Sequence, residues 1–297
     1  MDEDVPKAPL ELLVVSDVHI SLLALRRARR LESVLRRVAR MAPQAVLVVV
    51  GDFADYGMPW EYALFNRAIY RAGWKGRVLC AFGNHEHRLG PFRWSVARFV
   101  RFARRLAKQL LEASARGAAP HVSFGRMIGP AFDVVVQDEV HLIFLGSDEA
   151  PVRWDGARIS AEQAAWLADL LDEDERTHRI SLVFNHEPLF KTVAGSLPGE
   201  PSGRSVEGGG ALRAVLDAHA GTFLFTGHSH FPLDVFVAGK AGPTFANTGA
   251  VGFDDAYCED FAQGWLVRTG AGEVGLEGLN LLTGAPLAVR ARRRVRA

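Results

Sequence analysis

LLVVSDVH, from Leu12 to His19, is the stretch that decides the fold. Its apolar half, Leu12 to Ser16, is short and continuous, which is typical of a central strand that is covered on both faces. Its polar half places Asp17 and His19 directly after that strand. Open α/β sheets form their binding crevices at the carboxyl ends of such strands. The segment therefore predicts an α/β protein with a site at its strand ends.

Four later apolar runs end in polar residues of the same kind. They are Ala45–Val50 before Gly51-Asp52, Arg77–Phe82 before Gly83-Asn84-His85-Glu86, Ile180–Phe184 before Asn185-His186-Glu187-Pro188, and Thr222–Thr226 before Gly227-His228-Ser229-His230. Ahead of Ala45, apolar residues recur at helical spacing from Leu31 to Met41, with arginines largely on the other side, which predicts an amphipathic helix. Strands that alternate with helices in this way predict parallel crossovers.

The remaining patterns set the expected boundaries of the domain. Two apolar runs, Val134–Val136 and His141–Gly146, predict a hairpin in a second sheet region. Ser160 and Gln163 form a capping box that predicts a helix start. The expected organisation is a disordered N-terminus over residues 1–10, one domain over residues 11–285 with a helical insertion at about 88–120, and a basic tail over residues 286–297.

Composition argues against several classes of protein. The 35 basic and 34 acidic residues give a net charge of +1, which is not the strongly basic balance of a dedicated nucleic-acid binder. The N-terminus lacks the basic and apolar regions of a signal peptide. The longest apolar run, Ala45–Val50, is far below the roughly 18 residues that span a bilayer. Two cysteines, Cys80 and Cys258, are too few for a disulfide framework and favour a reducing compartment, so we expect a cytoplasmic protein.

The polar residues after the strands are of the types that bind metal ions. Asp17-x-His19 and His228-x-His230 each space two ligands at period two, so on an extended backbone each pair would grip metal together. The further candidates supply amide or carboxylate oxygen and imidazole nitrogen, and they are Asp52, Asn84 and His186. This mixed set, which contains no thiolate, suits Mn, Fe or Zn rather than a closed structural zinc site.

The ordered motifs resemble the signature of the calcineurin-like metallophosphoesterase superfamily, over about Leu12 to Gly252. The motifs that carry the resemblance are Asp17-x-His19, Gly51-Asp52-x-x-Asp55, Gly83-Asn84-His85-Glu86, His186 and Gly227-His228-x-His230. The resemblance implies a four-layer α/β/β/α sandwich with a dinuclear metal site at the C-terminal ends of the central strands. It also implies two ligand sets that share Asp52, namely Asp17, His19, Asp52 and His230 for one ion and Asp52, Asn84, His186 and His228 for the other.

The resemblance further implies a hydrolytic mechanism, in which a metal-bridging hydroxide attacks phosphorus in line. His85 is expected to face the phosphate, where it would stabilise the transition state or protonate the leaving oxygen. The alternative for His85 is a structural histidine behind the ligands. Asp55 and Glu86 are expected to lie outside the ligands, and one of them is expected to orient His85 by hydrogen bonding.

The residues around the motifs indicate a branch. Two arginines that are usual in Ser/Thr protein phosphatases are absent, because Tyr56-Gly57 and Phe82 stand at those positions. Asn185-His186-Glu187-Pro188 and Asn247-Thr248-Gly249-Ala250 resemble the branch of cyclic-nucleotide phosphodiesterases and purple-acid-phosphatase-like enzymes. The sequence therefore favours a phosphodiesterase or phosphomonoesterase with a small-molecule phosphoester substrate.

Two alternatives stay open at this point. The first is a nuclease of the same superfamily, against which the balanced charge speaks. Two arginine clusters, Arg98–Lys108 and Arg290–Arg296, are candidates for contact with polyanions, although a charge run is more often a solvated face. The second is a non-catalytic interaction scaffold, against which the complete set of candidate ligands speaks.

Overall fold

The computed structural model describes residues 9–87, 132–137, 139–149, 156–200, 205–239, 242–252, 262–270 and 272–295. Its elements in chain order are β1 (Leu10–Val15), η1 (Leu22–Ala24), α1 (Leu25–Met41), β2 (Val46–Val50), α2 (Pro59–Arg71), β3 (Val78–Ala81), α3 (Asn84–His87), β4 (Asp133–Gln137), β5 (Val140–Phe144), α5 (Ala161–Thr177), β6 (Ile180–Phe184), α6 (Gly210–Ala218), β7 (Phe223–Thr226), β8 (Asp234–Val237), β9 (Thr244–Asn247), β10 (Gln263–Gly270), β11 (Glu273–Asn280) and β12 (Pro286–Arg294). The helical insertion expected at 88–120 lies outside the described residues.

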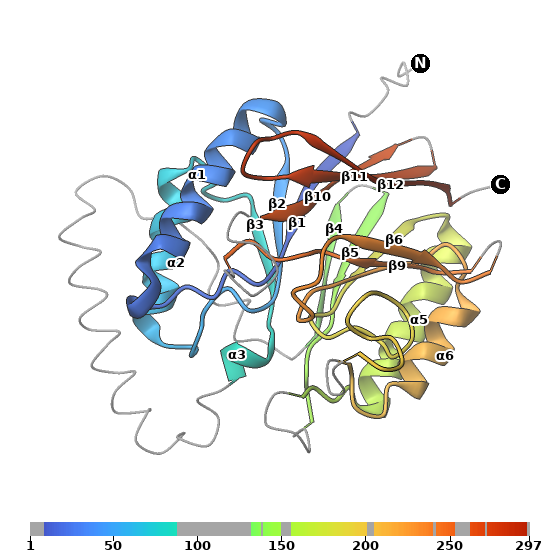
Figure 1. Cartoon of the computed structure of the whole chain (residues 1–297). Coiled ribbons are helices and arrows are strands. Elements are labelled where there is room, and N and C mark those ends of the chain that lie inside the picture. The colour runs from blue at the N-terminus through green and yellow to red at the C-terminus, as the bar shows by residue number, and fades with distance from the viewer. Residues whose placement is uncertain are drawn as a thin grey trace, which may run out of the picture.

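Two six-stranded sheets form the centre of the molecule (Figure 1). One has the order β12-β11-β10-β1-β2-β3, and the other has the order β4-β5-β6-β7-β9-β8. Helices α1 and α2 lie on the outer side of the first sheet, and α5 and α6 lie on the outer side of the second (Figure 1). The predicted four-layer α/β/β/α sandwich is therefore confirmed.

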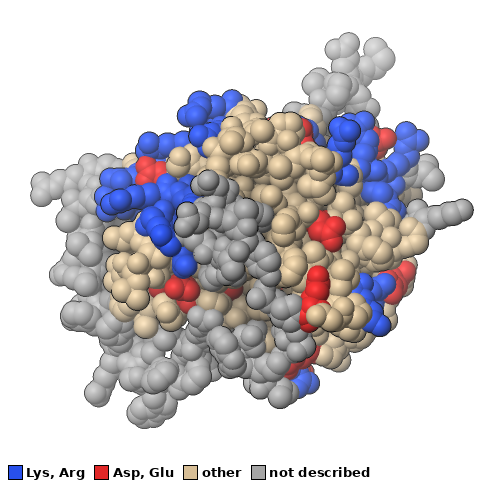
Figure 2. All heavy atoms as spheres, viewed as in Figure 1, with Lys and Arg blue, Asp and Glu red and all other residues tan. Residues whose placement is uncertain are grey.

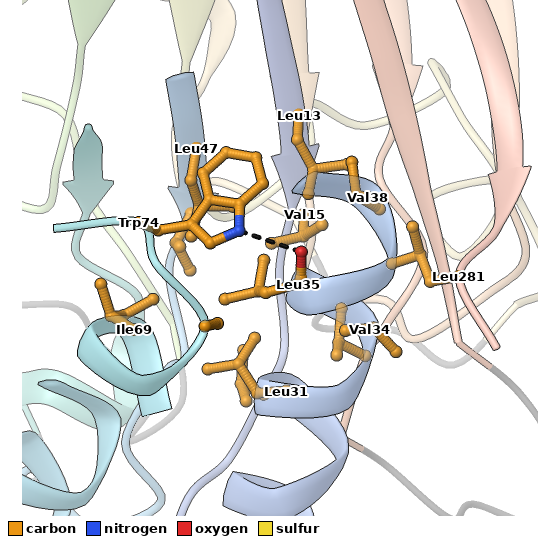
Figure 3. Close-up of a cluster of buried hydrophobic side chains, with 14 of the residues drawn as sticks. Leu13, Val15, Leu31, Val34, Leu35, Val38, Leu47, Ile69, Trp74 and Leu281 are labelled. Atoms are coloured by element: carbon orange, nitrogen blue, oxygen red, sulfur yellow. Dashed lines mark hydrogen bonds between the residues drawn. The ribbon is translucent and has the colours of Figure 1, made fainter. Parts of the chain in front are cut away.

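Alternation along the central strands explains why the layers stack. On β1, Leu13 and Val15 pack against the helices, whereas Leu12 and Val14 face the second sheet. Helix α1 buries a stripe of apolar residues at helical spacing, made up of Leu31, Val34, Leu35 and Val38. Trp74 closes this core, and its Nε1–H donates a hydrogen bond to the Leu35 carbonyl at 3.0 Å (Figure 3). The buried indole therefore keeps its polar group satisfied.

The strand pairing places the predicted ligands at one end of both sheets. β1 pairs in parallel with β2, and β2 with β3, while β5, β6 and β7 form a parallel set in the second sheet. β1 ends at Val15 and β2 at Val50, so Asp17 and Asp52 each follow two residues after a strand. The hairpin predicted from the apolar runs is also confirmed, because β4 and β5 pair antiparallel.

Several sequence expectations are corrected at the edges of the fold. Leu10, placed in the disordered N-terminus, begins β1. The segment expected as a basic tail forms β12 over Pro286–Arg294, where exposed and half-buried residues alternate and the strand pairs with β11. Gln163 does not complete a capping box: Ser160 caps α5, but the Gln163 amide bonds to the main chain of Gly146.

Within the described part of the chain, each helix is too short or too polar to span a bilayer.

Candidate metal centre

The predicted ligands meet where the strand ends of the two sheets adjoin. Three groups of side chains there offer ligand atoms that lie within 4.8 Å of one another. The groups are Asp17, His19 and His230; His19, Asp52 and His85; and Asp52, His186 and His228. Because His19 and Asp52 each belong to two groups, the three groups form one continuous cluster.

Asp52 lies at the middle of this cluster. Its Oδ2 atom is 3.1 Å from Nε2 of His186 and 3.6 Å from Nε2 of His19. Its Oδ1 atom accepts a hydrogen bond from the main-chain N–H of His85 at 3.0 Å. One oxygen is thus fixed by the main chain, and the other is turned toward histidines on both sides.

Asp17 shows the same division between its two oxygens. Its Oδ2 atom accepts hydrogen bonds from the Ser16 hydroxyl and, at 3.0 Å, from the His228 main-chain N–H. Its Oδ1 atom lies 3.1 Å from Nε2 of His230 and 3.7 Å from Nε2 of His19. These two Nε2 atoms are themselves 3.1 Å apart. One carboxylate oxygen and two imidazole nitrogens therefore face one another.

Main-chain carbonyls set the orientation of two histidine rings. Nδ1–H of His186 donates to the Val50 carbonyl at 2.7 Å, which turns Nε2 toward Asp52. Nδ1–H of His85 donates to the Asp55 carbonyl at 2.7 Å, and its Nε2 lies 3.7 Å from Oδ2 of Asp52. A carbonyl can only accept, so each bond fixes the proton on Nδ1 and leaves Nε2 facing the cluster. Asp55 is therefore the residue that orients His85.

Glu86 orients main-chain N–H groups, and not His85 as the sequence allowed. Its carboxylate accepts the main-chain N–H groups of Asp52 at 2.9 Å, Ala54 at 2.9 Å and Gly83 at 2.8 Å. Burial and then the charge of Asp52 raise the pKa of Glu86 to about 8, while the N–H bonds act in the opposite direction. Glu86 thus ties the loop after β2 to the loop after β3, and it holds Asp52 in place.

The backbone at five of the seven predicted ligands is in the left-handed region. The φ angles are 53° at Asp17, 47° at His19, 52° at Asp52, 63° at His228 and 56° at His230. Such a conformation costs about 1 to 2 kcal/mol for a residue with a Cβ, and this kind of strain clusters at functional sites. The extended backbone assumed from the period-two spacing is therefore wrong, because each strand ends before the ligands and the chain turns there. His228 and His230 accordingly fall into different groups.

Two motif glycines allow His186 to approach the loops of the first sheet. A Cβ on Gly83 would lie 2.2 Å from Oδ1 of Asp52 and 2.7 Å from Cδ2 of His186. A Cβ on Gly51, which has a φ of 79°, would lie 2.4 Å from Nδ1 of His186. The two sheets therefore meet at the site only because these positions carry no side chain.

Opposite charges control how the cluster titrates. Burial by itself raises the pKa of Asp17 and Asp52, but neighbouring histidines lower both pKa values below the ordinary range. Burial lowers the pKa of His19, whereas hydrogen bonds to Asp17 and then Asp55 raise it to about 9. Both carboxylates are therefore ionised at neutral pH, and they attract positive charge to the cluster.

Two buried atoms test whether this cluster suits a metal ion. Among the described residues, Oδ1 of Asn84 and Nε2 of His228 are buried and have no hydrogen-bond partner. Burial, and then the neighbouring His186, lower the pKa of His228 to about 3, so its ring is neutral and offers a lone pair. A buried polar atom without a partner costs about 1 to 3 kcal/mol, which coordination to a metal offsets. The residues therefore fit metal ions that accept oxygen and imidazole donors.

Sequence reasoning missed Arg27 of α1. Its Nη1 donates to the His19 carbonyl at 2.9 Å and lies 3.7 Å from Oδ2 of Asp55. The Asp55 carboxylate in turn lies 3.5 Å from Nδ1 of His19 and 3.4 Å from Nδ1 of His85. Arg27 precedes Leu31–Met41, the stretch that predicted the helix, and nothing in its sequence position marks a contact with His19.

Asn247 is a second residue whose structural role was not predicted. Its Nδ2 donates to the carbonyls of Phe231 at 2.9 Å and Pro232 at 2.8 Å, and its Oδ1 accepts from the Ser229 hydroxyl at 3.2 Å. Asn247 therefore anchors the loop that carries His228 and His230. The motif that begins at Asn247 indicated a branch of the superfamily, but it did not predict this contact.

Comparisons with known proteins identify the family. A family model described as calcineurin-like phosphoesterase matches residues 10–232. A dimetal phosphatase from Danio rerio is similar in structure, with a TM-score of 0.65 and 14% identity over 98% of this chain and 100% of that chain. A purple acid phosphatase from yellow lupin (Lupinus luteus) seeds has a TM-score of 0.61 and 12% identity over 96% of this chain and 53% of that chain.

Curated proteins provide no match. The solved structures are less than 25% identical to this chain, so their likeness concerns the fold. The family model covers most of the chain, including the strands and loops that carry the cluster. The chain belongs to the calcineurin-like phosphoesterases and is a hydrolase of phosphoric esters.

Proposed function

We propose that the chain hydrolyses a small phosphoester at a dinuclear metal centre whose two ions share Asp52. The position of Asp52 carries the proposal, because a single oxygen, Oδ2, faces His186 at 3.1 Å and His19 at 3.6 Å. Ligand groups therefore lie on both sides of one carboxylate. The proposed sets are Asp17, His19, Asp52 and His230 for one ion and Asp52, Asn84, His186 and His228 for the other.

The centre has a buried side and a side that reaches solvent. The side chains of His19 and His186 are fully buried, whereas those of His85 and His230 are 12% and 13% exposed. Substrate therefore approaches past His85 and His230. Two bound cations supply an activated water and a clamp on the phosphoryl oxygens.

His85 is the proposed catalytic side chain. Its Nδ1 is held by the Asp55 carbonyl at 2.7 Å, so only Nε2 is directed at the reacting phosphoryl group. From this position His85 donates a hydrogen bond to a phosphoryl oxygen or a proton to the leaving oxygen. The Asp55 carboxylate lies 3.4 Å from the same Nδ1 and so helps to hold the ring in this orientation.

Two aromatic residues support a small substrate rather than a phosphoprotein. Tyr56 and Phe82 stand where protein phosphatases usually carry arginines that grip phosphate. The Phe82 ring packs 6.2 Å from the Phe53 ring, centroid to centroid, and so extends the core. Because neither residue carries a guanidinium group that could bind phosphate, we assign substrate binding to the metal ions and His85.

The proposal is tested by hydrolysis of bis-p-nitrophenyl phosphate and p-nitrophenyl phosphate with Mn²⁺ added to the metal-free protein. We expect metal-dependent turnover that Asp52→Asn abolishes. Preference for the diester supports a phosphodiesterase, and preference for the monoester supports a phosphatase. Absence of metal-dependent turnover of either ester would exclude the proposed activity on simple esters. Faster cleavage of single-stranded DNA than of both esters would favour the nuclease.

A further inference from the structure

The outward face of helix α1 combines arginines with leucines. We call this region the α1 surface and define it by six of its exposed residues, which are Leu22, Leu23, Leu25, Arg29, Arg36 and Arg40. The apolar stripe that begins at Leu31 faces the core, so the arginines lie on the opposite side of the same helix. The leucines lie at the start of α1 and in the turn η1 before it.

Positive charge gathers over this layer and, separately, over the edge formed by β11 and β12 (Figure 2). Figure 2 shows Lys and Arg side chains gathered over α1 and α2. The single acidic residue of α1, Glu32, is held by Arg36 at 2.6 Å and Arg71 at 3.9 Å. The whole chain has a net charge of only +1, so the excess of positive charge is confined to parts of the surface. Guanidinium groups bind phosphate oxygens in a bidentate manner, which favours a phosphate-rich partner.

The exposed leucines decide which phosphate-rich partner fits. Leu23 is 93% exposed, Leu22 is 54% exposed and Leu25 is 42% exposed. Proteins bind single-stranded nucleic acids with basic residues and with aromatic rings that stack on bases, and the exposed leucines offer no such stacking surface. A bilayer provides both partners, because its acyl boundary accepts leucines and its anionic headgroups accept arginines. Together, the leucines and arginines fit an anionic lipid surface.

The α1 surface is also joined to the metal centre. Leu22 follows His19 by three residues, and Leu23 N–H donates to the Ser21 hydroxyl at 3.2 Å. From the same helix, Arg27 donates to the His19 carbonyl at 2.9 Å. A contact made by the leucines therefore fixes the position of the centre relative to the contacted surface.

We propose that the α1 surface docks the protein on anionic bilayers, with the η1 leucines at the boundary between headgroups and acyl chains and the α1 arginines on lipid phosphates. The docking goes beyond the proposed hydrolysis and does not rest on it, because lipid binding requires neither metal nor turnover.

The test is flotation of the full chain with vesicles of phosphatidylcholine, with and without phosphatidylglycerol. We expect binding only when phosphatidylglycerol is present. Two double variants test the two kinds of residue: Leu22→Ser with Leu23→Ser, and Arg29→Glu with Arg40→Glu. Each should lower the ratio of bound to free protein by about tenfold or more. The midpoint of thermal unfolding should stay unchanged in both double variants, which shows that they fold and that the loss of binding belongs to the α1 surface.

Matched control residues lie on two strands away from the α1 surface. Phe236 on β8 is 41% exposed, and Arg292 on β12 is also exposed. Phe236→Ser and Arg292→Glu should leave vesicle binding unchanged. Failure to bind anionic vesicles would overturn the proposal, as would equal losses in the controls. Binding to a single-stranded DNA oligonucleotide that needs the arginines but not the leucines, without vesicle binding, would assign the α1 surface to nucleic acid instead.

Discussion

Oδ2 of Asp52 lies 3.1 Å from Nε2 of His186, and this contact joins the two halves of the molecule. Asp52 follows β2 of the first sheet, and His186 follows β6 of the second. Neither sheet carries the cluster alone. The centre therefore forms only when the two sheets pack face to face, which links the stability of the sandwich to metal binding.

Asp52→Asn should lower kcat/KM by more than about a hundredfold. Removing a residue that only hydrogen-bonds to a metal ligand already lowers metal affinity or activity by about 10- to 100-fold, and Asp52 is proposed to touch both ions. The substitution keeps the shape of the side chain but removes its charge. Steady-state kinetics with Mn²⁺ measure the effect. Asp217→Asn on α6, an exposed carboxylate in an ion pair with Arg213, is the matched control and should retain full activity.

His85→Ala should lower kcat by about 10²- to 10⁴-fold while the protein keeps its metal ions, because His85 is assigned to the reacting phosphoryl group and not to the ligands. Elemental analysis beside the kinetic assay separates the two effects. If His85→Ala loses metal to the same extent as Asp52→Asn, then His85 is a structural or ligand residue and its catalytic role is wrong.

Gly83→Ala should prevent assembly of the centre, because the added Cβ would lie 2.2 Å from Oδ1 of Asp52. The expected result is loss of bound metal and a lower midpoint of thermal unfolding. Gly210→Ala at the start of α6 is the control, since no atom lies within 4 Å of its added Cβ. Equal behaviour of the two variants would mean that the close approach at Gly83 is not required.

The sequence predicts the fold because its signals are local. A buried strand followed by Asp17 or Asp52 is visible in consecutive residues, and alternation of strands with helices limits the topology. Main-chain geometry was not predictable in this way. The left-handed φ angles at Asp17 and His228 arise from turns that bring two sheets together, and nothing in Asp-x-His spacing distinguishes them from extended backbone.

Roles that depend on distant contacts were also hidden. Glu86 and Asp55 are equally plausible partners for His85 in the sequence, and only the folded loops show that the Asp55 carbonyl takes Nδ1–H. Arg27 resembles its neighbours on α1, yet its reach to the His19 carbonyl depends on how the helix packs. Strand β12 was not predicted, because the four arginines among its nine residues were interpreted as part of a basic tail.

His219 should make folding stability depend on pH. Its Nδ1 lies 2.7 Å from the Val215 carbonyl and its Nε2 lies 3.0 Å from Oδ1 of Asp172. Burial lowers the pKa of His219, but these two acceptors raise it above 6.5, because only the protonated ring donates to both. A histidine whose pKa is higher in the folded than in the unfolded protein stabilises the fold fully when the pH is below its unfolded pKa. This stabilisation is lost as the pH rises through its folded pKa.

His219→Gln should therefore destabilise the protein by a few tenths to about 1 kcal/mol in acid and by less in alkali. Urea unfolding at about pH 5.5 and about pH 9 measures the difference, with the wild type as reference. A loss of stability that is larger at the higher pH would contradict the assignment.

Anomalous diffraction from crystals grown with Mn²⁺ tests the central claim most directly. We predict two anomalous peaks, both within coordination distance of Oδ2 of Asp52, one beside His19 and His230 and the other beside His186 and His228. A single peak, or two peaks that do not share Asp52, would contradict the dinuclear centre proposed here.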